Sequence, residues 1–225
     1  HAVSCFNGND GSVVVMVAGG QQPLSFSLNG GTPQSGATFS GLPAGTYSVE
    51  VKDNLGFSVT TNEVTLVAPP AISVSAAATL NVITVTASGG TGTLQYSLNG
   101  MDFQAGNTFT SLLNGVYTVT VRDESGCTAT KEVTVNVPPL EIVSVNAGQP
   151  ILCFGDQTAG LEINASGGIP PYEYALDNGA FQSGNVFNGI AGGAHTVQVR
   201  DAAGTIQTLA ANIPQPAQLV ATVTV

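Results

Sequence analysis

One stretch of this sequence occurs three times, and the repetition constrains the fold more than any other feature. The copies are GGQQPLSFSLNGGTPQSGATFSGLPAGTYSVEVKDNLG from Gly19, GGTGTLQYSLNGMDFQAGNTFTSLLNGVYTVTVRDESG from Gly89 and GGIPPYEYALDNGAFQSGNVFNGIAGGAHTVQVRDAAG from Gly167. They align without a gap, and each begins with Gly-Gly and ends with Asp-x-x-Gly. Repetition of this kind indicates a tandem array of one structural module.

Prolines separate the copies and set the expected module boundaries. Proline is excluded from central strands and stiffens a linker. The separators are Pro69-Pro70, Pro138-Pro139 and the spaced Pro214 and Pro216. We expect repeat 1 at residues 1–69, repeat 2 at 70–138 and repeat 3 at 139–216.

The two ends of the chain fit a longer array. His1 is followed directly by strand-like sequence, so we expect an excised piece of a longer chain in which repeat 1 is truncated at its first strand. Residues 217–225 are expected to form the first strand of a further repeat, or else the closing strand of repeat 3.

Apolar and polar residues alternate within each copy, which predicts half-buried strands. In the third copy, for example, His195, Val197 and Val199 alternate with polar residues, which places these three on the inner face. The strands expected in repeat 2 are Ile72–Ser75, Val82–Ala87, Leu94–Leu98, Val116–Arg122 and Thr128–Val135. No helical period is present. The prediction is an all-β, elongated tandem array of three small immunoglobulin-like β-sandwich repeats.

Two recurring positions have a structural interpretation. Asp followed three residues later by Gly is typical of a tight hairpin, and the sites are Asp53 and Gly56, Asp123 and Gly126, and Asp201 and Gly204. The start of the preceding strand carries Tyr47, Tyr117 or His195, in a pattern that resembles the tyrosine corner of immunoglobulin-like sandwiches. We therefore expect His195→Tyr to keep or raise stability.

His195 is also the obvious candidate for catalysis, because the only other histidine is His1. A catalytic histidine needs a nucleophile or metal co-ligands, and the sequence has no Gly-x-Ser-x-Gly, His-Glu-x-x-His or Cys-x-x-Cys motif. We expect no enzymatic activity.

Charge excludes two classes of partner. The chain has 4 basic and 14 acidic residues and a net charge of −10. Nucleic acid and anionic membrane surfaces both select basic residues, so we expect neither as a partner. No apolar run is long enough to span a bilayer.

Three sets of residues are weak ligand candidates. Asp10 and Asp156 lie in loops and could contribute to a calcium site, although calcium needs six to eight oxygens; turn formation is the alternative, and we expect no cofactor. Gln34, Gln104 and Gln182 recur as exposed amides that could contact glycans or could instead bond the adjacent loop backbone. The Lys52-Asp53, Arg122-Asp123 and Arg200-Asp201 pairs could form a repeated clamp, but strand-end charges are the simpler interpretation.

The complete pattern resembles the SprB-repeat family, tandem modules of large Bacteroidota surface adhesins. The residues that carry the resemblance are the Gly-Gly start, Pro171-Tyr172, the Val-x-Val-Arg-Asp strand end and Cys-Phe-Gly-Asp from Cys153. The resemblance covers essentially the whole chain. It implies a location at the bacterial cell surface, export by type IX secretion, and a role in adhesion or gliding motility.

The cysteines depart from the family pattern, in which one cysteine near the repeat start accompanies one after the hairpin glycine. Here the first position reads Cys5, Ser75 and Cys153, and the second reads Phe57, Cys127 and Thr205. We therefore expect no disulfide within a repeat, with Phe57 filling the vacated space. Three buried free thiols are the favoured reading, and a Cys127–Cys153 bridge is the alternative.

The functional prediction is a non-catalytic stalk, spacer and adhesive segment of a secreted surface adhesin. Its expected partners are the neighbouring repeats, surface polysaccharide or solid substrata, and, through the parent protein, the secretion and motility machinery. The alternatives are a glycan-binding module, for which the absence of Trp is unfavourable, and an accessory domain of a secreted enzyme.

Overall fold

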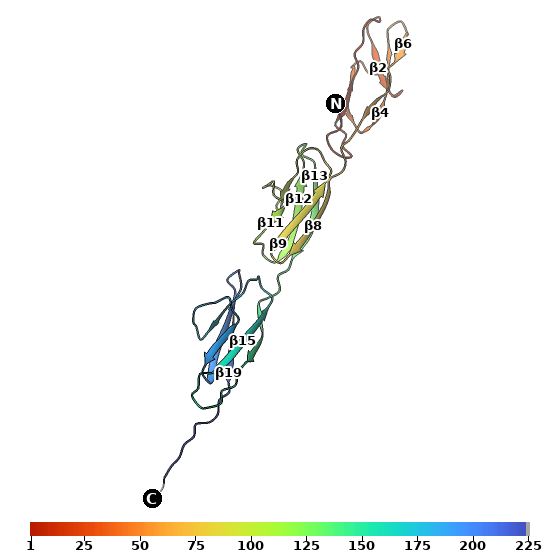
Figure 1. Cartoon of the computed structure of the whole chain (residues 1–225). Coiled ribbons are helices and arrows are strands. Elements are labelled where there is room, and N and C mark those ends of the chain that lie inside the picture. The colour runs from red at the N-terminus through yellow and green to blue at the C-terminus, as the bar shows by residue number, and fades with distance from the viewer. Residues whose placement is uncertain (224–225) are drawn as a thin grey trace. The chain divides into compact units, whose positions relative to one another are not determined.

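The computed structural model describes residues 1–223, and all regular structure within them is β-strand. The chain divides into two compact units, His1–Thr134, which contains repeats 1 and 2, and Val135–Val225, which contains repeat 3. Figure 1 shows the strands of each repeat gathered into their own sheets. No helix that could cross a membrane occurs in the described part of the chain.

Repeat 3 is a sandwich of two three-stranded antiparallel sheets. One sheet contains β14 (Glu141–Ala147), β15 (Ala159–Ser166) and β17 (Val186–Ile190), and the other contains β16 (Glu173–Leu176), β18 (Gly193–Arg200) and β19 (Ile206–Ile213). Leu161 and Ile163 from the first sheet pack with Val197 and Val199 from the second in one buried cluster. The alternation in the sequence thus places every second residue of β15 and β18 in the core.

Repeat 2 repeats this plan. Its sheets are β8 (Ser73–Thr79), β9 (Val82–Ser88) and β11 (Thr108–Phe109), and β10 (Gln95–Ser97), β12 (Gly115–Arg122) and β13 (Thr128–Val135). Ile83 and Val85 on β9, and Val119 and Val121 on β12, are fully buried.

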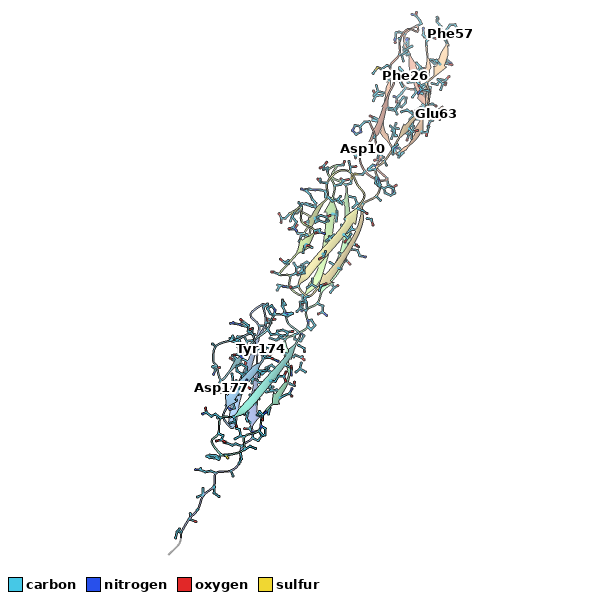
Figure 2. The ribbon with its side chains drawn as sticks, in the orientation of Figure 1. Asp10, Phe26, Phe57, Glu63, Tyr174 and Asp177 are labelled. Atoms are coloured by element: carbon cyan, nitrogen blue, oxygen red, sulfur yellow. A yellow bond between two sulfur atoms is a disulfide. The ribbon has the colours of Figure 1, made fainter. Side chains whose placement is uncertain are left out.

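Repeat 1 is built from shorter strands. The element β1 (Gly11–Val14) pairs with β3 (Thr38–Leu42). A second sheet has β5 (Val49–Lys52) at its centre, between β2 (Ser25–Leu28) and β6 (Ser58–Thr60). In a third, β4 (Gly45–Tyr47) pairs with β7 (Val64–Leu66). Phe26, labelled in Figure 2, is buried with Val49 and Val51. Among the described strands, none adds to the free edge of β1 as β8 adds to β9.

The prediction of an all-β chain of small immunoglobulin-like sandwiches is confirmed, and the strands predicted for repeat 2 correspond to β8, β9, β10, β12 and β13. The strands β3, β11 and β17, which follow the Gln-containing loops, were not predicted from the sequence. Residues 217–223 are not assigned to a strand because no strand of the described chain pairs with them. Residues 224–225 of the predicted strand lie outside the described residues.

Candidate functional site

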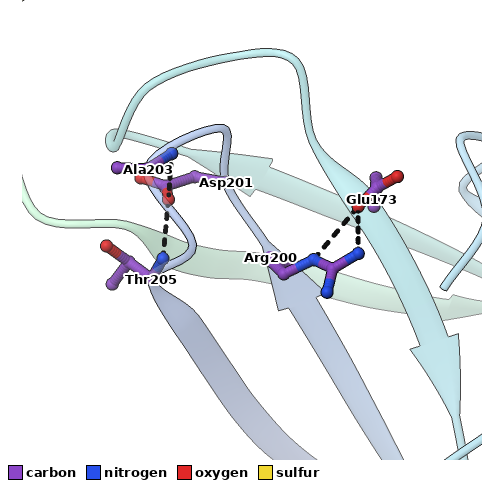
Figure 3. A network of polar contacts seen from close by, with 5 residues as sticks. All are labelled: Glu173, Arg200, Asp201, Ala203 and Thr205. Atoms are coloured by element: carbon purple, nitrogen blue, oxygen red, sulfur yellow. Dashed lines mark hydrogen bonds and ion pairs between the residues drawn. The ribbon is translucent and has the colours of Figure 1, made fainter. Parts of the chain in front are cut away.

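Asp201 follows β18 and organises the hairpin to β19. Its Oδ1 accepts the backbone N–H groups of Ala203 at 3.0 Å and Thr205 at 2.8 Å, as Figure 3 shows. Its Oδ2 accepts the N–H of Ile169, directly after the Gly-Gly turn, at 3.0 Å. Asp201 is buried, and a buried carboxylate is stable only when such donors replace its water. The side chain therefore joins two loops of the module.

Asp123 has the same role in repeat 2. It accepts the N–H groups of Cys127 and Thr91, both at 2.8 Å. A Cβ atom on Gly90 would lie 2.8 Å from Asp123 Oδ2, and Gly90 has φ of +69°. Glycine is needed here because it allows both the close approach and the left-handed backbone.

Asp53 completes the set in repeat 1, in a more exposed setting. It accepts the N–H groups of Leu55 and Phe57 with Oδ1 and that of Gln21 with Oδ2. Desolvation raises the pKa of Asp53, but these backbone donors outweigh it and hold the pKa below its ordinary value. The turn glycines Gly56, Gly126 and Gly204 all have positive φ.

Both strand-end arginines are held within their own repeat. Arg200 pairs with Glu173 on the neighbouring β16 (Figure 3), and its guanidinium lies 4.2 Å from the centre of the Phe181 ring. Arg122 lies 3.9 Å from the centre of the Phe103 ring in the same way. These contacts stabilise strand ends and leave no repeated clamp of unpaired cations at Arg122 and Arg200.

The corner position has one geometry in all three repeats. Each side chain bonds the carbonyl oxygen of the residue four positions earlier: Tyr47 Oη to Pro43 at 2.8 Å, Tyr117 Oη to Leu113 at 3.0 Å, and His195 Nε2 to Ala191 at 3.0 Å. His195 thus makes the same local bond as the two tyrosines. This bond gives His195 a structural role that requires neither a nucleophile nor a metal ligand beside it.

His195 has a second contact that the tyrosines lack. Its Nδ1 lies 2.7 Å from Asp177 Oδ2, and the side chains are 12% and 50% exposed respectively. The hydrogen bond that His195 donates to Asp177 raises the pKa of His195, although burial opposes the rise. Bonds from His195 and from the N–H of Thr196 lower the pKa of Asp177. Since both ring nitrogens face acceptors, only the imidazolium can donate to both.

Asp177, labelled in Figure 2, stands where repeat 1 has Asn29. Asn29 Oδ1 accepts the N–H of Ser48 at 2.8 Å, and Asp177 Oδ1 accepts that of Thr196 at 2.8 Å. The change from Tyr to His at the corner is therefore accompanied by a change from Asn to Asp at its neighbour. The sequence shows both changes, but only the structure shows their contact.

The recurring glutamines clamp their own loops. The Nε2 atoms donate in pairs to backbone carbonyls: Gln34 to Gly36 and Thr38, Gln104 to Gly106 and Thr108, and Gln182 to Gly184 and Val186, at 2.7–3.2 Å. With both amide hydrogens used, these side chains have no donor left for a glycan.

The two calcium candidates are not brought together with other ligands. Asp10 accepts the N–H of Ser4 at 3.0 Å and also its hydroxyl, and these bonds lower the pKa of Asp10. Asp156 is exposed in its loop. Within residues 1–223, no group of three or more His, Cys, Asp or Glu side chains has a metal-binding arrangement.

The prediction of three buried free thiols is wrong, and so is the alternative of a Cys127–Cys153 bridge. Cys5 and Cys127 form a disulfide that spans 122 residues and joins the first loop of repeat 1 to the hairpin of repeat 2, within the first compact unit. Cys153 is a free thiol and is exposed, so it pairs with neither. Phe57, expected to fill vacated space, is 73% exposed. The signal that could have revealed this bridge is that repeats 1 and 2 each carry one cysteine, at complementary positions.

Ser75 is not the structural counterpart of Cys5 and Cys153, although all three lie at the same distance in sequence before the Gly-Gly start of their repeats. It lies inside β8, and β8 is joined to β9 by Leu80 and Asn81 alone. In repeat 3 residues 148–158 separate β14 from β15 and carry Cys153. The cysteine-bearing loop is therefore missing from repeat 2, and the Gly-Gly starts of repeats 2 and 3 are correspondingly eight residues further apart than those of repeats 1 and 2.

The family model described as SprB repeat matches residues 3–33 and 146–181. Each matched segment includes the cysteine, Cys5 or Cys153, and continues through the Gly-Gly turn of repeat 1 or repeat 3. No curated protein matches the sequence.

Several solved structures of multi-domain β-proteins are similar to this chain. Extracellular domains 3–5 of Drosophila OTK share 13% identity, cover 92% of each chain and give a TM-score of 0.27. The N-terminal eight Ig domains of Down syndrome cell adhesion molecule share 14% identity over 95% of this chain and 40% of that one, with a TM-score of 0.28. Fibronectin(III)-like modules of Clostridium thermocellum CbhA share 14% identity over 64% and 95%, with a TM-score of 0.23. These scores are low, so the fold assignment rests on the strand pairing described above.

Proposed function

We propose that this chain, in which two segments match the SprB repeat, is a non-catalytic spacer and adhesive segment of a large secreted adhesin at a bacterial cell surface. In this proposal the parent protein reaches the surface by type IX secretion and acts in attachment or gliding. The neighbouring repeats are its first partners, and surface polysaccharide or a solid substratum is the target.

The observation that carries the proposal is the Cys5–Cys127 disulfide between consecutive modules. Tension applied at the two ends of the chain would pass from Cys5 directly to Cys127 and would bypass the intervening residues. The segment between Cys5 and Cys127 could not extend while the bond is intact, whereas β13, which follows Cys127, is outside the bridged segment. A covalent bypass of this kind suits a load-bearing spacer, whereas a catalytic domain has no need of it.

The polar side chains of the modules support the same proposal. The hairpin aspartates, the corner residues and the loop glutamines each bond the backbone of their own repeat. Their bonds stabilise small sandwiches that have modest cores, which is what a chain of repeated modules requires.

Single-molecule extension tests the load-bearing role. Oxidised chains should release only repeat 3 and the residues of repeat 2 that follow Cys127. Reduction should add about 430 Å of extensible chain, from the 122-residue separation at about 3.5 Å per residue. The matched control is Cys153→Ser, which should behave as the unsubstituted chain. Equal extension before and after reduction would contradict the bypass.

Small-angle scattering tests the reach expected of a spacer. A single compact domain of this length would have a radius of gyration of about 17 Å. The spacer requires a clearly larger value, and a value near 17 Å would count against it.

A further inference from the structure

The loop that carries Cys153 has the same backbone conformation as the loop that carries Cys5. Each cysteine is followed two positions later by a residue with positive φ, Asn7 at 58° and Gly155 at 85°. In each loop the cysteine carbonyl accepts the N–H three residues on, from Gly8 at 2.9 Å or Asp156 at 3.3 Å. The turn is therefore the same in both repeats.

The side chains around the two cysteines also agree. Val3 and Ile151, two residues before the cysteines, are 4% and 5% exposed and anchor each loop to its own core. Phe6 and Phe154, directly after the cysteines, are about half exposed. Cys153 is thus held on its module as Cys5 is held, but its thiol is free and exposed.

The partner of Cys5 occupies a position that recurs in every repeat. Cys127 directly follows the hairpin glycine, and its N–H is bound by Asp123 Oδ1. Phe57 and Thr205 have the same bond, to Asp53 and Asp201 respectively. The hairpin of any such repeat therefore presents this side chain in one defined place.

At the two junctions within this chain, the loop of one repeat and the hairpin cysteine of the next are either both present or both absent. Repeat 1 has the loop with Cys5, and repeat 2, which follows it, has Cys127. Repeat 2 lacks the loop, and repeat 3, which follows it, has Thr205 at the hairpin position. Repeat 3 has the loop again, with Cys153.

We propose that Cys153 is the covalent attachment site for a further module of the same type, one that carries a cysteine directly after its Asp-x-x-Gly hairpin. The module would be joined through residues 214–216, as repeat 2 is joined to repeat 1 through Pro69-Pro70. This inference concerns a bond and does not depend on the proposed function, so the two can fail separately.

The bond can form with a small disulfide, such as oxidised glutathione, as the oxidant. The Cys153 thiolate attacks one glutathione sulfur and displaces the other as a thiolate, which leaves a mixed disulfide. The hairpin thiolate then attacks the Cys153 sulfur and displaces the second glutathione. Two electrons pass to glutathione, and the two thiol protons end on its two released thiols.

The test uses two full chains joined end to end, Val225 to His1, with Phe57→Cys in the second copy. That substitution supplies a hairpin cysteine in the first module after repeat 3. After folding with oxidised glutathione, peptide mapping should find Cys153 of the first copy linked to position 57 of the second. The fraction of that Cys153 recovered as free thiol or glutathione adduct should be at least tenfold lower than in the single chain.

The matched control is the same double chain with Phe57 retained, in which Cys153 of the first copy should be recovered only as the free thiol or its glutathione adduct. A second variant replaces residues 217–225 of the single chain with residues 71–138, which supplies Cys127 in its native hairpin and covers the case in which Phe57→Cys does not fold. Recovery of Cys153 only as free thiol or glutathione adduct in folded protein, while each Cys5–Cys127 bond forms, would overturn the proposal. Linkage only between separate molecules would also overturn it.

Discussion

Exchange of the His195–Asp177 pair for the Tyr–Asn pair of repeat 1 should change how the stability of repeat 3 depends on pH. As an imidazolium, His195 donates to Asp177 at 2.7 Å and to the Ala191 carbonyl at 3.0 Å. When it loses a proton, one of the two acceptors loses its donor. Tyr at this position would bond the Ala191 carbonyl at any pH below its own ionisation.

The sign follows from the direction of the pKa shifts. The pKa of His195 is raised in the folded chain, so its contribution to stability is complete below pH 6.5 and is lost as the pH rises through the folded value. The pKa of Asp177 is lowered, so its contribution is present above 3.8 and is lost as the pH falls through the folded value. The pair therefore stabilises repeat 3 between these two folded pKa values.

The magnitude is modest because Asp177 is 50% exposed. An ion pair in such a setting contributes about 0.5–1 kcal/mol. His195→Tyr alone should therefore cost about this much near pH 6 and almost nothing near pH 9, which revises the expectation from sequence that it is neutral or favourable. Adding Asp177→Asn should recover most of the loss.

The assay combines two measurements. Ring NMR titration gives the pKa of His195 directly, and Asp177→Asn should lower it. Hydrogen exchange of peptides from β18 and β19 reports the stability of repeat 3 alone, and a double-mutant cycle isolates the pair. A coupling free energy that is the same at pH 6 and pH 9, or a His195 pKa at or below 6.5, would refute the reasoning.

Three further predictions concern the disulfide and the loop clamps. Cys127→Ser should lower the free energy of unfolding of repeats 1 and 2 by about 3–5 kcal/mol where they unfold together, because the bond closes a 122-residue loop. Thermal unfolding checks this. As a control, the variant should have the same unfolding temperature as the reduced unsubstituted chain. Asp201→Ala should destabilise repeat 3 by about 2–3 kcal/mol in denaturant titration, because it removes the acceptor of three backbone N–H groups. Asp53→Ala, at a more exposed site, should cost less. Gln182→Ala should cost about 1 kcal/mol and leave any glycan-array signal unchanged, and a selective loss of glycan binding would restore the ligand interpretation.

The features that the sequence predicted well are those completed within one repeat. Val197 and Val199 alternate with polar neighbours, and this local period is enough to place them in the core. The hairpin at Asp201 follows from residues within a four-residue turn. By contrast β11, only Thr108–Phe109, is too short for any period, and its pairing to β9 depends on residues far away in the sequence.

The cysteines show why the rest could not be predicted. A gapless alignment assigns Ser75 to the position of Cys5, but the loop is absent from repeat 2 and Ser75 lies in a strand. The family pattern then suggests that each repeat has lost half of its own disulfide. The partners lie in different repeats, so the pairing depends on the junction between modules, which no property of a single repeat encodes.

The two kinds of paired change in this chain follow one rule. His195 and Asp177 replace Tyr and Asn together because the imidazolium needs an acceptor. The single amide oxygen of Asn29 is already bound to the backbone, whereas Asp177 binds the backbone with Oδ1 and has Oδ2 for His195. Cys5 and Cys127 occur together because a disulfide needs both sulfurs. In each case, where another repeat has a different residue at one position of the pair, the residue at the other position is different or missing as well. Variation between copies is therefore interpretable only when positions in contact are compared together, and for a tandem chain those contacts include the next module.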